Sequence, residues 1–103
     1  MLTSAILGWS HGADAQTVAL KCQLDGGGWK SCLMHVQDIG RTWNIEMGQE
    51  TVFFRHDGGG AIAMKQRGGD WKLVQTHWIA VPASNQPALC WDSLCALGAV
   101  PLD

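Results

Sequence analysis

Two closely spaced pairs of cysteines constrain the fold of this chain more than any other feature. Cys22 and Cys32 flank a glycine-rich segment, and Cys90 and Cys95 flank residues 91–94. Both intervening segments have turn-forming residues, so each pair lies where a β-hairpin would bring two strands together. The spacings therefore predict two hairpins, each closed by a disulfide, with cross-pairing between the two pairs left open.

The four cysteines have two alternatives to disulfide formation, a metal site and free thiols. Structural zinc sites are built from C-x2-C pairs, whereas the spacings here are C-x9-C and C-x4-C. Four reduced, buried thiols would be the state in a cytosolic protein. Disulfides persist only in oxidising compartments, so the favoured state predicts a periplasmic or secreted protein with no bound metal.

Size and composition indicate one folded domain. The chain has 103 residues, of which 47% are hydrophobic, and its formal net charge is -2. This content supports a hydrophobic core and argues against intrinsic disorder. There is no cluster of Lys and Arg and no apolar run long enough to cross a bilayer. We therefore expect neither a nucleic-acid partner nor a transmembrane segment.

The first sixteen residues differ in character from the rest. Residues 2–9 are mildly apolar, and Ala13-Asp14-Ala15 matches the small-x-small pattern that signal peptidase recognises. Residues 1–16 are therefore predicted to be a signal-peptide remnant that lacks the usual basic region. The alternative is an N-terminal segment docked on the domain. Either way, residues 17–103 form a single disulfide-stapled β-domain.

Residues from Thr17 onward alternate between polar and apolar with the period of two that is typical of β-strands. The alternation places the apolar residues of segments 17–24 and 29–39 on one face of a hairpin. If Cys22 and Cys32 lie opposite each other, both share that face. The register required by the disulfide then agrees with the one indicated by the apolar alternation. The other members of this face are Val18, Leu20, Leu24, Met34 and Val36.

The middle of the chain continues the pattern. Segment 51–56 carries Val52 and Phe54 on one face and Phe53 on the other. It is therefore either a strand covered on both faces or a strand with one exposed aromatic residue. A glycine pair at 68–69 then predicts a two-residue turn that pairs Met64 with Leu73.

The same turn assigns the faces of segment 71–80. Its odd-numbered residues, among them Trp71, Leu73, His77 and Ile79, are directed toward the core. Trp78 is directed to the opposite face. The register also sets Lys65 opposite Lys72, and directly opposed like charges are unfavourable.

A second two-residue turn is predicted at Asp92-Ser93. It makes Cys90 and Cys95 a non-hydrogen-bonded pair, whose short separation suits a disulfide. Trp91 would then shield the turn between Cys90 and Cys95. A helical turn over residues 91–95 is the competing geometry, because Asp-Ser is a poorer turn dipeptide than Asp-Gly.

These segments predict an all-β domain, a small antiparallel meander barrel of seven or eight strands, with a two-sheet β-sandwich as the alternative. A barrel of this length with disulfides resembles the small periplasmic lysozyme inhibitors in outline. Those proteins carry a Ser-Gly-x-x-Tyr type motif on their inhibitory loop. This chain has no Tyr and no Ser-Gly pair, so the resemblance covers architecture only.

No motif for nucleotide, zinc or calcium chemistry is present, and no catalytic residue or cofactor is predicted. Adjacent Arg55, His56 and Asp57 lie on a glycine-rich tip and are candidates for a polar binding site. Trp29 and Trp78 are the candidate surface aromatics, since indole faces stack on sugar rings and anchor protein interfaces.

The function predicted from these features is that of a small exported binding or inhibitory module for a protein, a glycan or an envelope component. One alternative is a small enzyme that uses the loop site of Arg55, His56 and Asp57. A second alternative is a structural envelope protein without a small ligand. The oligomeric state is left open.

Overall fold

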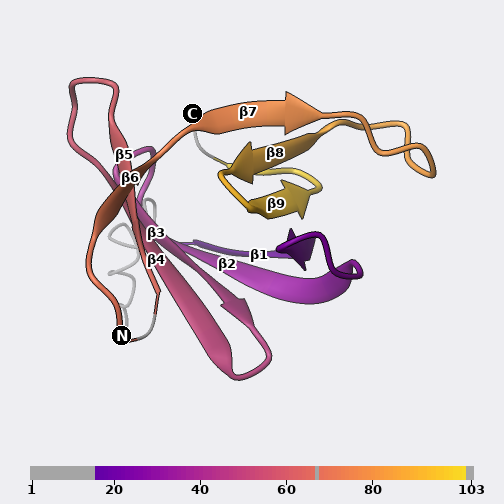
Figure 1. Cartoon of the computed structure of the whole chain (residues 1–103), viewed down its shortest axis with the longest axis horizontal. Coiled ribbons are helices and arrows are strands. Elements are labelled where there is room, and N and C mark those ends of the chain that lie inside the picture. The colour runs from indigo at the N-terminus through magenta and orange to yellow at the C-terminus, as the bar shows by residue number, and fades with distance from the viewer. Residues whose placement is uncertain (1–15, 67, 102–103) are drawn as a thin grey trace, which may run out of the picture.

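The computed structural model describes residues 16–66 and 68–101, and the described part contains nine β-strands and no helix. Residues 1–15 of the predicted signal segment 1–16 lie outside the described residues, and its last residue, Gln16, begins the first strand (Figure 1). The strands are β1 (Gln16–Leu24), β2 (Lys30–Asp38), β3 (Thr42–Met47), β4 (Glu50–His56), β5 (Ile62–Lys65), β6 (Lys72–Val74), β7 (Thr76–Ile79), β8 (Ala88–Trp91) and β9 (Leu94–Leu97).

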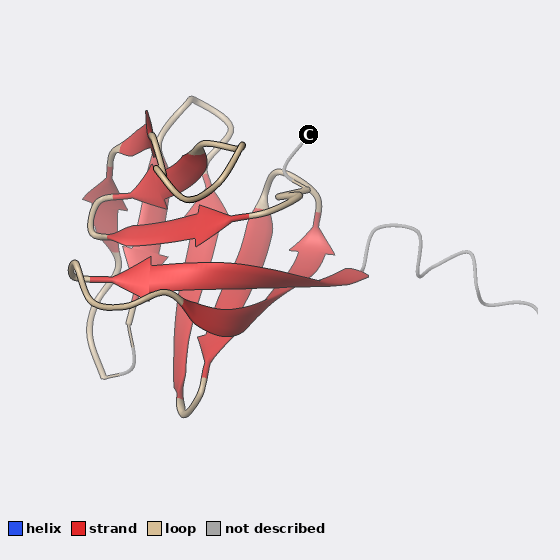
Figure 2. Ribbon diagram, turned by 90° about the vertical axis from the view of Figure 1, so that its right-hand side faces the viewer, coloured by secondary structure: helices blue, strands red, loops and turns tan. Residues whose placement is uncertain are grey.

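All nine strands belong to one antiparallel sheet in the order β6-β5-β4-β3-β2-β1-β9-β8-β7. The two end strands, β6 and β7, are consecutive in the chain and are separated only by Gln75. The predicted long strand 71–80 is therefore divided: its first part pairs with β5 and its second part with β8. This exchange curls the sheet into a nearly closed barrel (Figure 2), as predicted, with nine strands rather than seven or eight.

The first hairpin confirms the predicted faces but not the predicted register. Cys32 lies opposite Leu20 and Cys22 lies opposite Lys30, so the two cysteines are diagonal neighbours. They still form the predicted disulfide, with their Cα atoms 5.9 Å apart. An offset of two residues preserves the face on which every side chain lies, because side chains alternate with a period of two. Leu20, Met34 and Val36 are accordingly buried.

The hairpin of β5 and β6 differs from its prediction by one residue. Met64 lies opposite Lys72, whereas Leu73 lies opposite Ala63. The N–H of Gly69 donates to the carbonyl of Gln66 over 2.9 Å, and the register leaves three residues between Gln66 and Asp70, where the predicted turn had two. A one-residue shift exchanges the two faces of the strand. Leu73 is therefore 73% exposed and not a core residue.

The same shift removes the unfavourable pairing of Lys65 with Lys72. Val74, which lies opposite Ile62, is the residue of β6 that packs against the core. The outer face of β6 is thus the face that the sequence pattern had assigned to the interior.

The hairpin of β8 and β9 forms around the predicted two-residue turn. Trp91 lies opposite Leu94, and Cys90 lies opposite Cys95, to which it is disulfide-bonded. Asp92 has a φ of 53°, a left-handed conformation that Asp tolerates better than most residues. The competing helical turn does not form.

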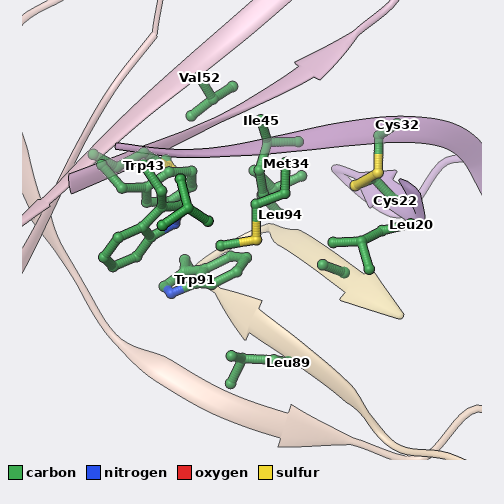
Figure 3. Packing of buried hydrophobic residues seen from close by; sticks show 14 residues of the cluster. Leu20, Cys22, Cys32, Met34, Trp43, Ile45, Val52, Leu89, Trp91 and Leu94 are labelled. Carbon is green, nitrogen blue, oxygen red and sulfur yellow. A yellow bond between two sulfur atoms is a disulfide. The ribbon is translucent and has the colours of Figure 1, made fainter. Parts of the chain in front are cut away.

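Trp91 is fully buried in the main core, whereas the Asp92-Ser93 turn that it was predicted to shield is exposed. Its ring centroid lies 4.8 Å from that of Phe54 and 6.1 Å from that of Trp43. Figure 3 shows Trp91 beside Trp43 in the core. Successive strand residues face opposite sides of the sheet, so Trp91 and Cys90 cannot both point to the same side. Trp29 instead packs against the smaller cluster that contains both cysteines.

Candidate functional site

The two predicted surface tryptophans have different environments. Trp78 is 63% exposed on β7, whereas Trp29 is half-buried against Ala88, Cys90 and Cys95. Trp78 lies directly opposite Leu89, a core residue, so the prediction that it occupies the face opposite the core is wrong. It is exposed because β7 is an end strand of the sheet. Trp78 remains a surface candidate and Trp29 is partly structural.

Arg55, His56 and Asp57 do not form one site. Arg55 and His56 are consecutive residues of β4 and point to opposite sides of the sheet. The carboxylate of Asp57 accepts hydrogen bonds from the backbone N–H groups of Gly59 at 2.7 Å and Ala61 at 3.2 Å. These two bonds lower the pKa of Asp57, because they stabilise its charged form. Asp57 therefore stabilises its own loop.

Arg55 belongs to a different cluster, on the outer face of β4, β5 and β6. Its guanidinium carbon lies 4.2 Å from the ring centroid of Trp71, and the Nζ of Lys65 lies 5.9 Å from the same ring. Two exposed apolar side chains flank these groups. Phe53 is 43% exposed and lies opposite Lys65, and Leu73 is 73% exposed. We call these five residues the cationic aromatic patch.

Strand pairing explains why the patch forms. Arg55 lies opposite Ala63, and Ala63 lies opposite Leu73, so a row of outward side chains crosses three strands. Ala63 is small, which leaves room above it for larger neighbours on both sides. The patch therefore depends on the observed register of β5 and β6.

The two cations of the patch have no carboxylate partner among residues 16–66 and 68–101. The ion pairs of that part of the chain join His35 to Glu46 and Arg41 to Asp38. Cation–π contacts at exposed sites contribute roughly 0.5–1 kcal/mol and leave the charge in place. Arg55 and Lys65 thus present positive charge beside apolar surface.

A shallow groove of about 460 Å³ lies elsewhere, on the outer face of β9, β1, β2 and β3, with Ala19, Leu33 and Leu97 among its lining residues. Several of its polar side chains are bonded within the domain. Lys21 donates to Ser31 Oγ over 3.2 Å, and Glu46 Oε1 lies 2.9 Å from His35 Nε2. The carboxylate of the groove is therefore already paired with a histidine, whereas neither cation of the cationic aromatic patch has an ion pair within the described residues.

A second hollow, of about 320 Å³, lies between the β1–β2 turn and the β3–β4 turn. Cys22, Leu24 and Met47 contribute apolar surface to it, and Lys30 and Glu50 are also among its lining residues. Charges of both signs at one small opening do not select a ligand by charge. Neither hollow brings Arg55, His56 and Asp57 together.

Four residues of the patch were not among the predicted site residues: Phe53, Lys65, Trp71 and Leu73. Two features of the sequence bear on the exposure of Phe53 and Leu73. The phenylalanines at 53 and 54 required either a covered strand or one exposed aromatic residue, and Phe53 is the exposed one. The predicted opposition of Lys65 and Lys72 was an argument for a shifted register, and that shift turns Leu73 outward.

No protein-family model, curated protein or solved structure matches this chain. In the described part of the chain, no three His, Cys, Asp or Glu side chains gather as a metal site would require. The same residues include no helix with the length and hydropathy needed to cross a membrane. Functional inference therefore rests on the geometry of the domain itself.

Proposed function

We propose that this domain is an exported binding module that recognises a partner protein through the cationic aromatic patch. The observation that carries the proposal is the placement of Arg55 and Lys65 over Trp71, beside the exposed Leu73 and Phe53. Contiguous exposed apolar surface next to polar groups is typical of interaction sites. Aromatic residues and Arg are also the residue types enriched at protein interfaces.

The chemistry of the patch favours a protein segment that presents carboxylates next to apolar side chains. Carboxylates would pair with Arg55 and Lys65, which lack acidic partners within the described residues. Apolar side chains would cover Leu73 and Phe53. A glycan fits less well, because a sugar ring stacked on Trp71 would have to displace the Arg55 guanidinium at 4.2 Å.

Export is supported by the cysteines. Both pairs are disulfide-bonded, and the described residues contain no free cysteine. Disulfides of this kind are rare in reducing compartments and common in small secreted domains. A periplasmic or otherwise extracytoplasmic protein would meet its partner in the same oxidising environment.

The proposal can be tested with a peptide array that contains three matched sets, in which apolar residues alternate with acidic, basic or neutral polar residues. We expect the acidic set to bind preferentially, and binding to weaken as the salt concentration rises. The variant Arg55→Gln/Lys65→Gln should lose most of this binding. Affinity capture from the native envelope fraction with wild-type and variant domains would then identify the natural partner.

The matched control is Arg41→Gln/Lys21→Gln, which removes the same charge from residues outside the patch. This control should bind the acidic peptides as the wild type does. Equal binding of all three peptide sets, or equal loss in both double variants, would show that the patch is not the recognition surface.

A further inference from the structure

The free edge of β7 is a second feature that could bind another chain, because its backbone groups are unpaired. β7 is the last strand of the sheet and pairs on one side with β8. Figure 1 shows β8 below β7 and no strand above it. An unpaired strand edge presents a row of backbone N–H and C=O groups that another strand can bond.

Hydrogen bonds at the preceding residue identify which groups are unpaired. The N–H of Gln75 donates to Asp92 Oδ1, and its C=O accepts from the N–H of Asp92, both on the side of β8. Successive residues of a strand direct these groups to opposite edges. The groups of Thr76 and Trp78 therefore point away from β8, and no turn or loop backbone bond within residues 16–66 and 68–101 involves them.

The sequence around this edge lacks the usual protection against strand addition. Exposed edges are normally blunted by charged residues, Pro or bulges. Residues 74–81 contain no Asp, Glu, Lys, Arg, Gly or Pro. The edge instead displays Trp78, which is 63% exposed.

We propose that this edge pairs with the same edge of a second copy of the chain, in an antiparallel dimer centred on Trp78. The free edge is limited at one end by Val74, which is paired with Ile62 of β5. It is limited at the other end by Pro82, which has no N–H to donate. Trp78 lies midway between these limits, so a two-fold axis at Trp78 lets both copies use the whole edge.

This register is self-complementary, as an isologous interface requires. Trp78 lies opposite Trp78 of the partner subunit, and Thr76 lies opposite Ala80 of the partner subunit. A shift of the axis toward β6 would drive each copy against β5 of the other, and a shift the opposite way would shorten the ladder of hydrogen bonds. The paired tryptophans share one face of the joined sheets, where directly opposite side chains contact each other.

The inference is independent of the cationic aromatic patch and is tested by association alone. Sedimentation velocity over a range of concentrations should show a monomer–dimer equilibrium for the oxidised domain. Hydrogen exchange read by NMR should show the Thr76 and Trp78 amides becoming protected as concentration rises. The amide of His77 should not change, because it already faces β8.

Two variants separate side-chain from backbone contributions. Trp78→Ala should raise the dimer dissociation constant at least roughly tenfold, as expected for a central aromatic contact. Ala80→Pro removes one outward N–H and should weaken association as well. Leu33→Ala, which shortens an exposed apolar side chain on β2, is the matched control and should leave association unchanged.

A monomer at every concentration up to about 1 mM, with Thr76 and Trp78 amides exchanging freely throughout, would overturn the proposal. Association that survives both Trp78→Ala and Ala80→Pro would also overturn it, because the contact would then lie elsewhere. Near-wild-type circular dichroism of each variant shows that a loss of association is not a loss of fold.

Discussion

Asp92 and Gln75 are joined by two hydrogen bonds at the point where the sheet closes on itself. The N–H of Asp92 donates to the carbonyl of Gln75 over 3.0 Å, and Asp92 Oδ1 accepts from the N–H of Gln75 over 2.8 Å. Gln75 is the residue between β6 and β7, where the chain leaves one strand partner and gains another. The Asp92 side chain thus supplies the acceptor that a neighbouring strand would otherwise provide.

Removing this acceptor should destabilise the barrel. Asp92→Gly keeps a residue that accepts the φ of 53°, whereas Asp92→Asn keeps both that φ and an Oδ1 acceptor. We expect the Gly variant to be about 1 kcal/mol less stable than the Asn variant, the usual net value of one hydrogen bond. Urea unfolding under oxidising conditions measures the difference.

Asp25 provides the control for this comparison. It has a φ of 54° in the β1–β2 turn, so Asp25→Gly and Asp25→Asn carry the same change of residue type. If the two variants of Asp25 differ in stability as much as the two variants of Asp92, the bond to Gln75 contributes nothing.

The two disulfides should contribute unequally to stability. The chain-entropy model assigns about 3 kcal/mol to closing the longer Cys22–Cys32 loop and about 2 kcal/mol to the shorter Cys90–Cys95 loop. Cys22→Ala/Cys32→Ala should therefore lower the free energy of unfolding more than Cys90→Ala/Cys95→Ala. Equilibrium unfolding of both double variants gives the order.

Thiol alkylation provides an independent check that all four cysteines are oxidised. The native protein should take up no label without reductant, and all four cysteines should react after reduction. Labelling of native, unreduced protein would contradict both the disulfides and the inference of an oxidising compartment.

Asp57 should make the stability of its loop depend on pH. Its pKa is lowered below 3.8 by the backbone N–H groups of Gly59 and Ala61. A lowered folded-state pKa stabilises the native state above the unfolded-state pKa. That stabilisation is lost as pH falls through the folded-state value. Asp57→Asn should therefore be less stable than the wild type near neutrality and approach it in strong acid.

Carboxyl chemical shifts followed by NMR during an acid titration give the pKa of Asp57 directly. A value at or above 3.8 would mean that the two backbone bonds are not maintained in solution.

Gly98 should not tolerate a side chain. Its φ is +137°, and a Cβ built on it would lie 2.7 Å from Leu20 Cδ2. Gly98→Ala should cost roughly 1–3 kcal/mol of stability, because it combines backbone strain with overpacking. Thermal or urea unfolding measures this loss.

A substitution at Gly58 separates the effect of backbone strain from that of overpacking. Its φ is +86°, yet nothing lies within 4 Å of its added Cβ, so Gly58→Ala carries strain alone. Shortening Leu20 to Ala should reduce the additional cost of Gly98→Ala, since neighbouring substitutions are not additive. Equal losses for Gly58→Ala and Gly98→Ala, unaffected by Leu20→Ala, would argue against the close contact.

The strands before residue 57 were predictable because their alternation is unambiguous. Met34, Ile45 and Phe54 lie on the faces that the period of two assigns to them, and all three are buried. The cysteine partners were also predictable, because each pair flanks a short turn. The two-residue offset between Cys22 and Cys32 left these faces unchanged.

The candidate site was predicted only in part, because its residues depend on one turn. Arg55 and Trp78 are exposed as expected, but Trp78 lies on the core-side face of an end strand. Leu73 and Trp71 were assigned to the interior by a turn of two residues. The observed turn is one residue longer, and that single residue places both side chains on the outer face.

The sequence by itself determined an all-β chain, its two disulfides and the core faces of its first strands, because these follow from local alternation and short-range spacing. Only the tertiary structure decided which side chains gather at the surface. The register of β6 on β5 and the change of partner at Gln75 arise from contacts between residues distant in sequence. Local patterns carry no record of such contacts, so neither the cationic aromatic patch nor the free edge of β7 could be derived from them.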